Sequence, residues 1–219
     1  MNIKQILYDQ KEEIASLNTS DLCRRVEEGA FDLQSSLAQV VIGVRRRGKS
    51  TLCMKVLKDS GVSFGYVNFD DEQLAGLKAE QLNDVLEALY KVYGDITHVL
   101  FDEIQNISQW PLFVNRLLRQ GLRVVMTGSN ANLLSSELAT HLTGRYNQIE
   151  LYPFSFREYC TIRQIDTQSL STKVKAFRYA ALEEYLRQGG FPELLKLNNP
   201  YTYTLSLADV FVNNCLKER

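Results

Sequence analysis

Eight consecutive residues match the pattern G-x-x-x-x-G-K-[ST], which combines two glycines with a lysine and a hydroxyl side chain: Gly43-Val44-Arg45-Arg46-Arg47-Gly48-Lys49-Ser50. Gly43 and Gly48 permit backbone conformations that aim successive N–H groups at phosphate oxygens. Lys49 is expected to reach the β- and γ-phosphates of a nucleotide, and the Ser50 hydroxyl to bind Mg²⁺. The segment therefore predicts a site for a nucleoside triphosphate with Mg²⁺.

The residues on either side of this loop predict the structure that phosphate binding requires. The apolar run 40–42 predicts a strand that ends at the loop, and residues 51–58 predict a helix that follows it. A helix that begins at Lys49 adds its positive amino-terminal end to the phosphate site. We also assign Thr51, in the first turn of this helix, to the nucleotide site.

Three arginines, Arg45, Arg46 and Arg47, lie inside the loop. One interpretation is a solvated basic surface at the loop tip, and we favour it for at least one of them. The other interpretation is contact with the nucleotide or with a partner domain. We assign Arg46 to the nucleotide site on the second interpretation, and the sequence is consistent with both.

Two adjacent acids, Asp102 and Glu103, follow the apolar strand signal of residues 98–101. Asp102 is placed to hold the water shell of Mg²⁺, and Glu103 to polarise the water that attacks the γ-phosphate. A strand-and-helix unit, 64–69 and 82–93, separates these acids from the phosphate loop, as in proteins with an inserted strand. The acid pair therefore predicts that the bound nucleotide is hydrolysed.

Further polar candidates follow the strand signal at 124–126. Thr127, Ser129 and Asn130 are candidates for a side chain between the acid pair and the γ-phosphate, and we assign Ser129; the alternative is a simple turn and helix cap. Arg145 precedes the last strand signal. It is a candidate for stabilising transition-state charge on the γ-phosphate, within its own subunit or across an interface, or else it forms a structural salt bridge. Of the two catalytic alternatives, we favour action within its own subunit.

Alternating strands and helices predict how these residues are positioned. Five short strands interleaved with helices favour an α/β fold, a P-loop NTPase with a mainly parallel five-stranded sheet of order 5-1-4-3-2 flanked by helices. We expect an amino-terminal helical segment over 1–38 that packs on the core, an ATPase domain over 39–152 and a small helical appendage over 153–219. Besides 51–58 and 82–93, helices are expected over 3–17, 21–37, 111–119, 132–141, 156–161, 174–187 and 203–217.

Composition excludes several classes of protein. The net charge of −1 gives no broad attraction to DNA or to an anionic membrane, and no apolar run reaches the length of a membrane span. The four cysteines have no metal-ligand spacing and are expected to be buried thiols in a cytoplasmic protein. A GTPase is disfavoured because the sequence has no Asn-Lys-x-Asp segment. A small-molecule kinase is disfavoured because the Asp-Glu pair would direct ATP to water.

Six motifs in this order resemble a prokaryotic family of AAA+-type ATPases that carry a C-terminal domain of unknown function. They are the loop at 43–50, Asp102-Glu103-Ile104-Gln105, Gly128-Ser129-Asn130, Thr143-Gly144-Arg145-Tyr146, Pro153-Phe154-Ser155-Phe156-Arg157-Glu158 and Gly189-Gly190-Phe191-Pro192-Glu193. The resemblance implies nucleotide and Mg²⁺ roles for Lys49, Ser50, Asp102 and Glu103, and a γ-phosphate sensor at Arg145. Val44 and Ser50 replace the Pro and Thr usual in that family.

The resemblance also implies a second half, because the family continues for about as many residues again after the position of Arg219. We expect a cytoplasmic ATPase module that uses ATP and Mg²⁺ to drive or gate a protein partner or a missing C-terminal domain. The alternatives are an ATP-dependent binding switch with negligible hydrolysis and a DNA-associated ATPase, for which the charge gives no support.

Overall fold

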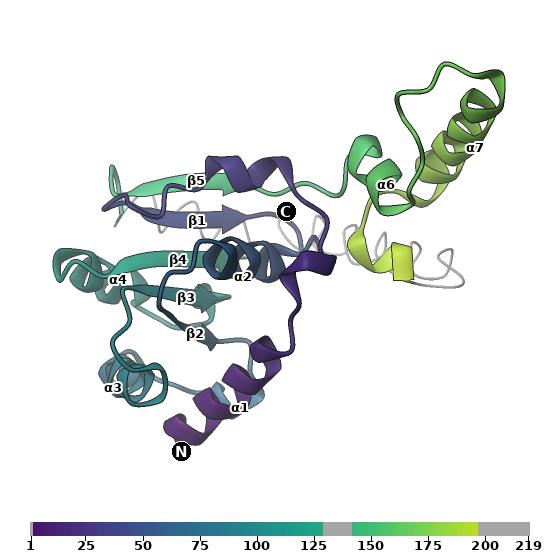
Figure 1. Cartoon of the computed structure of the whole chain (residues 1–219). Coiled ribbons are helices and arrows are strands. Elements are labelled where there is room, and N and C mark those ends of the chain that lie inside the picture. Colours follow the sequence, from purple (N-terminus) through teal and green to yellow (C-terminus); the bar gives the residue numbers. More distant parts are fainter. Residues whose placement is uncertain (1, 129–141, 197–219) are drawn as a thin grey trace, which may run out of the picture. The chain divides into compact units, whose positions relative to one another are not determined.

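A single parallel sheet forms the centre of the chain in the computed structural model, which describes residues 2–128 and 142–196. Its five strands are ordered β2-β3-β4-β1-β5 (Figure 1), and every neighbouring pair is parallel. The predicted P-loop NTPase fold and strand order are therefore confirmed, read from the opposite edge of the sheet. The strands are β1 (Ala38–Ile42), β2 (Phe64–Asn68), β3 (His98–Asp102), β4 (Arg123–Gly128) and β5 (Tyr146–Glu150).

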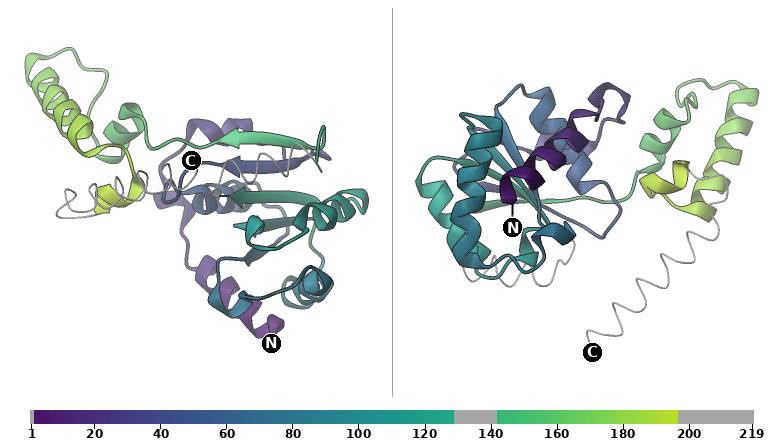
Figure 2. Two further views of the ribbon diagram at one scale, coloured as in Figure 1. Left: turned by 180° about the vertical axis from the view of Figure 1, so that it is seen from behind. Right: turned by 90° about the horizontal axis from the view of Figure 1, so that it is seen from below.

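Helices cover both faces of the sheet because the central strands are apolar on both sides. In β3, Leu100 packs with α2 (Lys49–Asp59) on one face, whereas Val99 and Phe101 pack with α3 (Leu82–Tyr93) and α4 (Trp110–Arg119) on the other. Figure 2 shows the same layers from behind and from below. Short 3-10 turns lie at Thr19–Asp21, Val26–Ala30, Glu72–Leu74, Ala79–Gln81, Ile104–Asn106 and Pro192–Lys196.

Helix α1 (Ile3–Ala15) packs on α3 and on the edge strand β2. The side chain of its buried Gln10 bonds to both backbone groups of Asn68. Nε2 donates to the Asn68 carbonyl (3.1 Å), and Oε1 accepts from the Asn68 N–H (3.0 Å). One side-chain amide therefore replaces a neighbouring strand at this point of the sheet edge.

The helix expected over residues 21–37 is absent, and this prediction is wrong. Two short 3-10 turns and further turns occupy this part of the chain. Side chains satisfy its backbone N–H groups locally: the Glu28 carboxylate accepts from the Arg25 N–H at 2.7 Å, and Asp32 accepts from the N–H groups of Gln34 and Ser35 at 3.1 Å each. Such side-chain bonds compete with a continuous helix.

Contacts divide the chain into two compact units, 1–151 and 152–219. The described part of the second unit contains α6 (Phe156–Ile162) and α7 (Thr172–Gln188), which ends at Gly189 with φ +84°. Gly190 packs so closely on Phe154 that a Cβ would lie 2.1 Å from its carbonyl oxygen. Two of the sequence motifs thus meet inside this unit. The helices expected over 132–141 and 203–217 lie outside the described residues.

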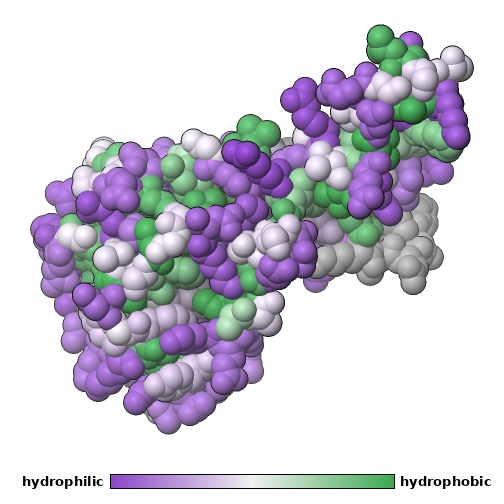
Figure 3. Space-filling view, viewed as in Figure 1, coloured by the Kyte–Doolittle hydropathy of each residue, from purple (hydrophilic) through white to green (hydrophobic). Residues whose placement is uncertain are grey.

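The surface of α7 is unusually apolar for an exposed helix. Phe177, Tyr179 and Leu186 are each more than half exposed, and apolar side chains are visible on the surface of this unit in Figure 3. Within the described parts of the chain, no helix combines the length and apolar character that a membrane crossing requires.

Candidate nucleotide-binding and catalytic site

The phosphate loop joins the carboxyl end of β1 to the start of α2, and glycines fix its shape. Gly48 caps α2 with φ +85°, a left-handed conformation that favours glycine. Gly43 has φ +147°, and a Cβ there would lie 2.5 Å from the Leu151 carbonyl oxygen. Both glycines of the loop pattern therefore occupy positions where a side chain would strain the backbone or clash.

Lys49 is buried at the first position of α2, with 5% of its surface exposed. Its Nζ lies 3.7 Å from Glu103 Oε1 and 3.5 Å from the Val44 carbonyl oxygen. Burial lowers the pKa of Lys49, whereas the negative charges of Glu103 and Asp102 oppose that shift. The sequence placed Lys49 and Glu103 in one site, and the structure brings their charged groups together.

Three hydroxyl groups surround the buried carboxylate of Asp102. Ser50 Oγ donates to Asp102 Oδ1 at 2.8 Å, and Thr127 Oγ1 donates to the same oxygen. Burial raises the pKa of Asp102, and the hydrogen bonds from Ser50 and Thr127 oppose this. Hydroxyl and carboxylate oxygens are the ligands that Mg²⁺ prefers, usually together with water and substrate phosphates. Ser50 and Asp102 therefore fit the metal site expected of them.

Tyr66 supplies the third hydroxyl, and none of the sequence motifs includes this residue. Its OH donates to Asp102 Oδ2 at 3.3 Å, from the neighbouring strand β2. Burial is the main cause that raises the pKa of Tyr66, so the phenol stays a donor. A tyrosine in the middle of an apolar strand is typical of a core residue, and only the pairing of β2 with β3 places it beside Asp102.

Glu103 directly follows β3 in a left-handed conformation, φ +52° and ψ +44°. Such a conformation is unfavourable for a non-glycine residue. Its N–H donates to Thr127 Oγ1 at 3.2 Å, and its Oε2 accepts from Gln105 Nε2. Thr127 thus contacts both acids. The other two candidates from that strand end, Ser129 and Asn130, lie outside the described residues.

The three loop arginines have different surroundings. The side chain of Arg45 is 63% exposed and pairs with Asp70 at 3.2 Å. Arg47 Nη1 donates to the Leu151 carbonyl oxygen at 3.1 Å. Arg46 has φ +68°. Thr51, also assigned to the nucleotide, lies partly exposed in the first turn of α2.

Arg145 and the phosphate loop lie at opposite ends of the parallel strands. Arg145 precedes β5 at the amino end of the parallel strands, and its carbonyl accepts from the Ala38 N–H at 2.9 Å, where β1 begins. The phosphate loop follows the other end of β1, roughly 15 Å away for a strand of five residues. The within-subunit role that we expected for Arg145 therefore does not fit this geometry.

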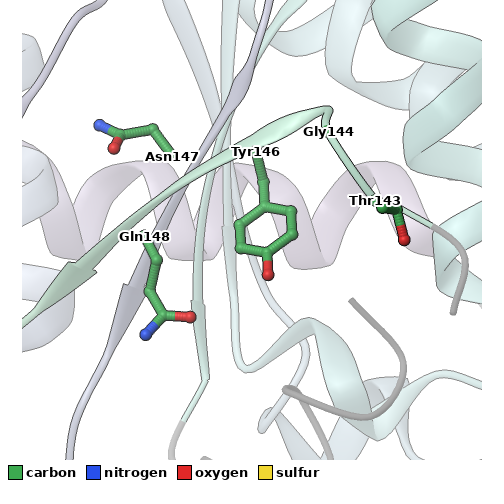
Figure 4. A pocket seen from close by; sticks show the side chains of 5 residues that line it. All are labelled: Thr143, Gly144, Tyr146, Asn147 and Gln148. Atoms are coloured by element: carbon green, nitrogen blue, oxygen red, sulfur yellow. The ribbon is translucent and has the colours of Figure 1, made fainter. Parts of the chain in front are cut away.

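Arg145 Nη1 donates to Asn115 Oδ1 on α4 at 2.9 Å. Among the described residues, the partner of the Arg145 guanidinium is thus a neutral amide and not the carboxylate of a salt bridge. Residues on both sides of Arg145 line a cavity of about 520 Å³ (Figure 4): Thr143, Gly144, Tyr146, Asn147 and Gln148.

The three cysteines among the described residues are free thiols. Cys53 and Cys160 are buried and Cys23 is partly buried, all as free thiols, and Cys215 lies outside the described residues. Burial raises the pKa of Cys53 well above its usual value. In the described ranges 2–128 and 142–196, no group of three or more His, Cys, Asp or Glu side chains is arranged so that it could hold a metal ion.

Comparison with solved structures supports the fold. A Walker-type ATPase of Pyrococcus abyssi superimposes with a TM-score of 0.57 at 16% identity, over 91% of this chain and 76% of that protein. At this identity the likeness concerns the fold alone.

Two curated relatives match at the sequence level, and both are uncharacterized. The protein of Methanocaldococcus jannaschii is 31% identical over 202 residues, 90% of this chain and 45% of its own length. The protein of Haemophilus influenzae is 36% identical over 182 residues, 79% of this chain and 44% of its own length. The chain thus spans less than half the length of these relatives. Residues 35–160 match the family model described as an AAA domain, so the chain belongs to the AAA domain family.

Proposed function

We propose that this chain binds Mg²⁺ and ATP at the phosphate loop and hydrolyses the γ-phosphate. The observation that carries the proposal is the convergence of Lys49 and Ser50, at the start of α2, with Asp102 and Glu103, at the end of β3. Ser50 and Asp102 are joined at 2.8 Å, and the charged groups of Lys49 and Glu103 lie 3.7 Å apart. Purified protein should release phosphate from ATP in Mg²⁺ and none in excess chelator.

Each residue has one task in this reaction. Lys49 neutralises charge on the β- and γ-phosphates, and the backbone N–H groups of residues 43–50 hold the remaining oxygens. Ser50 and Asp102 would hold Mg²⁺, which offsets charge on the phosphates when it is bound. Glu103 accepts a proton from water while the water oxygen bonds to the γ-phosphorus. The bond from that phosphorus to the β–γ bridging oxygen breaks, and ADP and phosphate leave.

We further propose that the nucleotide controls the part of the chain that follows Leu151. The supporting observation is that two phosphate-loop residues meet one carbonyl oxygen, that of Leu151. Gly43 leaves no room for a Cβ there, and Arg47 Nη1 donates to it at 3.1 Å. Leu151 is the last residue of the first compact unit. A change in loop conformation on nucleotide binding would therefore act directly on the start of the second unit.

Replacing Arg47 with methionine tests this coupling. Wild-type protein should show a change in amide hydrogen exchange over residues 151–155 when a non-hydrolysable ATP analogue saturates it. Arg47→Met should reduce that change to about half or less, because the loop loses its charge-assisted bond to the Leu151 carbonyl. The matched control is Arg45→Met, which removes the same charge from the same loop but only an exposed ion pair.

Each variant is compared at its own saturating analogue concentration, so a difference in affinity does not affect the result. The coupling proposal is overturned if Arg47→Met retains the full wild-type change, or if both variants lose it equally.

We propose that Arg145 acts on the nucleotide of a neighbouring copy of the chain. The supporting observation is its position at the amino end of β1 and β5, whereas its own phosphate loop follows the carboxyl end of β1. Turnover per molecule should then rise with protein concentration. Mixing Arg145→Ala with Glu103→Gln protein should restore activity, since each supplies the group that the other lacks.

In an equal mixture of subunits that contact head to tail, about a quarter of the interfaces carry both intact residues. Turnover should therefore recover to about that fraction of the wild-type value. A mixture that stays as inactive as its components, with wild-type turnover constant on dilution, would exclude a role across an interface.

A further inference from the structure

Gln105 contacts the carboxylate of Glu103, but the reaction described above gives Gln105 no role. After the left-handed backbone at Glu103, the 3-10 turn Ile104–Asn106 folds the chain back toward the site. This places Gln105 Nε2 against Glu103 Oε2, while Glu103 Oε1 faces Lys49 at 3.7 Å. The Glu103 carboxylate therefore contacts Gln105 through one oxygen and Lys49 through the other.

The orientation of the Gln105 amide follows from its partner. An ionised carboxylate only accepts hydrogen bonds, so the nitrogen of the amide must face Glu103. The amide oxygen, Gln105 Oε1, is then buried, and it has no hydrogen-bond partner among the described residues. Buried acceptors without a partner are uncommon in native proteins.

We propose that Gln105 is a positioning residue that holds Glu103 in its catalytic orientation after ATP has bound; this rests on the hydrolytic function proposed above. Lys49 must turn to the phosphates when ATP enters, and Glu103 then loses its contact with Lys49. The bond from Gln105 Nε2 remains and fixes the carboxylate beside the γ-phosphate. Accurate orientation of a reacting group is a large part of catalysis, so loss of this bond should slow the chemical step.

The turn itself does not depend on the Gln105 side chain. Asn106 Nδ2 donates to the Phe69 carbonyl oxygen (3.2 Å) and to Asp70 Oδ1 (3.3 Å), which attaches the turn to the end of β2. Ile104 is fully buried in the core. Gln105→Met keeps the length of the side chain and removes only the amide, so the variant is expected to fold.

The test is a double-mutant cycle between Gln105→Met and Glu103→Gln. Gln105→Met alone should lower kcat by about 10-fold or more, with the Kd for ATP unchanged within about 2-fold, because the lost contact orients the base and not the nucleotide. In the Glu103→Gln background the same substitution should change kcat by less than about 2-fold, because residues that act as a unit are not additive. The control is Gln73→Met, the same substitution at an exposed position.

Two results overturn the positioning role while the hydrolytic function stands: wild-type kcat in Gln105→Met, or an equal loss of kcat in both backgrounds. A merely structural role would instead lower ATP affinity and thermal stability together, which also counts against the proposal. If wild-type protein shows no hydrolysis that depends on Lys49, the proposed function itself fails, and the positioning role fails with it.

Discussion

Lys49→Ala is expected to weaken binding of Mg²⁺-ATP by about 100-fold or more, as for loss of one partner of a buried charge pair. Lys49 is the ammonium group placed for the β- and γ-phosphates, and only 5% of its surface is exposed. The substitution leaves two acids, Glu103 and Asp102, without the positive charge that opposes them. Triphosphate would then enter a site with unbalanced negative charge, so repulsion adds to the lost attraction.

The affinity is measured by titration calorimetry, with Lys91→Ala as the control. Lys91 is an exposed lysine of α3 that pairs with Glu87, so its loss removes the same charge at little cost in stability. Wild-type affinity for ATP in Lys49→Ala would show that the phosphate-loop assignment is incorrect.

Glu103→Gln is expected to lower kcat by about 10²-fold or more, the scale of a lost general base, while ATP and Mg²⁺ still bind. The amide has the shape of the carboxylate but does not accept the proton of water. Binding is retained because Lys49, Ser50 and Asp102 keep their groups. Glu103→Gln also removes a negative charge beside Lys49 that competes with phosphate, so ATP affinity should stay equal or rise.

Glu87→Gln is the matched control, because Glu87 is an exposed carboxylate on α3 and undergoes the same substitution. Turnover is measured at saturating ATP for each protein. Unchanged hydrolysis in Glu103→Gln, with Asp102 intact, would move the catalytic role to another residue.

Most of the fold could be predicted because its signals are local and repeat along the chain. Apolar runs of strand length alternate with helical periodicity, and right-handed parallel connections leave few arrangements for such a chain. The phosphate loop and the acid pair add the information that an extra strand lies between them. Lys49, Ser50, Asp102 and Glu103 could be assigned because each belongs to a spacing with a known physical requirement.

In residues 21–37 the spacing of the apolar residues predicts a helix, whereas the polar side chains favour turns, and the turns form. Asp32 and Glu28 bond to nearby backbone N–H groups, and Gly29 and the serines at 35–36 lower helix propensity further. The apolar spacing alone did not reveal this competition.

The placement of Arg145 could have been deduced from the sequence. A residue that precedes a strand of a parallel sheet lies at the amino ends of the strands. The phosphate loop follows a strand and therefore lies at their carboxyl ends. Tyr66 and Gln105 are different, because neither contact follows from spacing. Tyr66 reaches Asp102 across a strand pair, and Gln105 reaches Glu103 only because the backbone at Glu103 is left-handed.

The most direct test of the account is single-turnover hydrolysis, with protein in excess of radiolabelled ATP so that all nucleotide is bound. The account predicts Mg²⁺-dependent conversion of bound ATP to ADP and phosphate in the wild-type protein. Glu103→Gln should bind the same amount of ATP and convert it at a rate that is lower by about 10²-fold or more. Bound ATP that stays intact in the wild-type protein for as long as in Glu103→Gln would contradict the account and identify the chain as a binding switch.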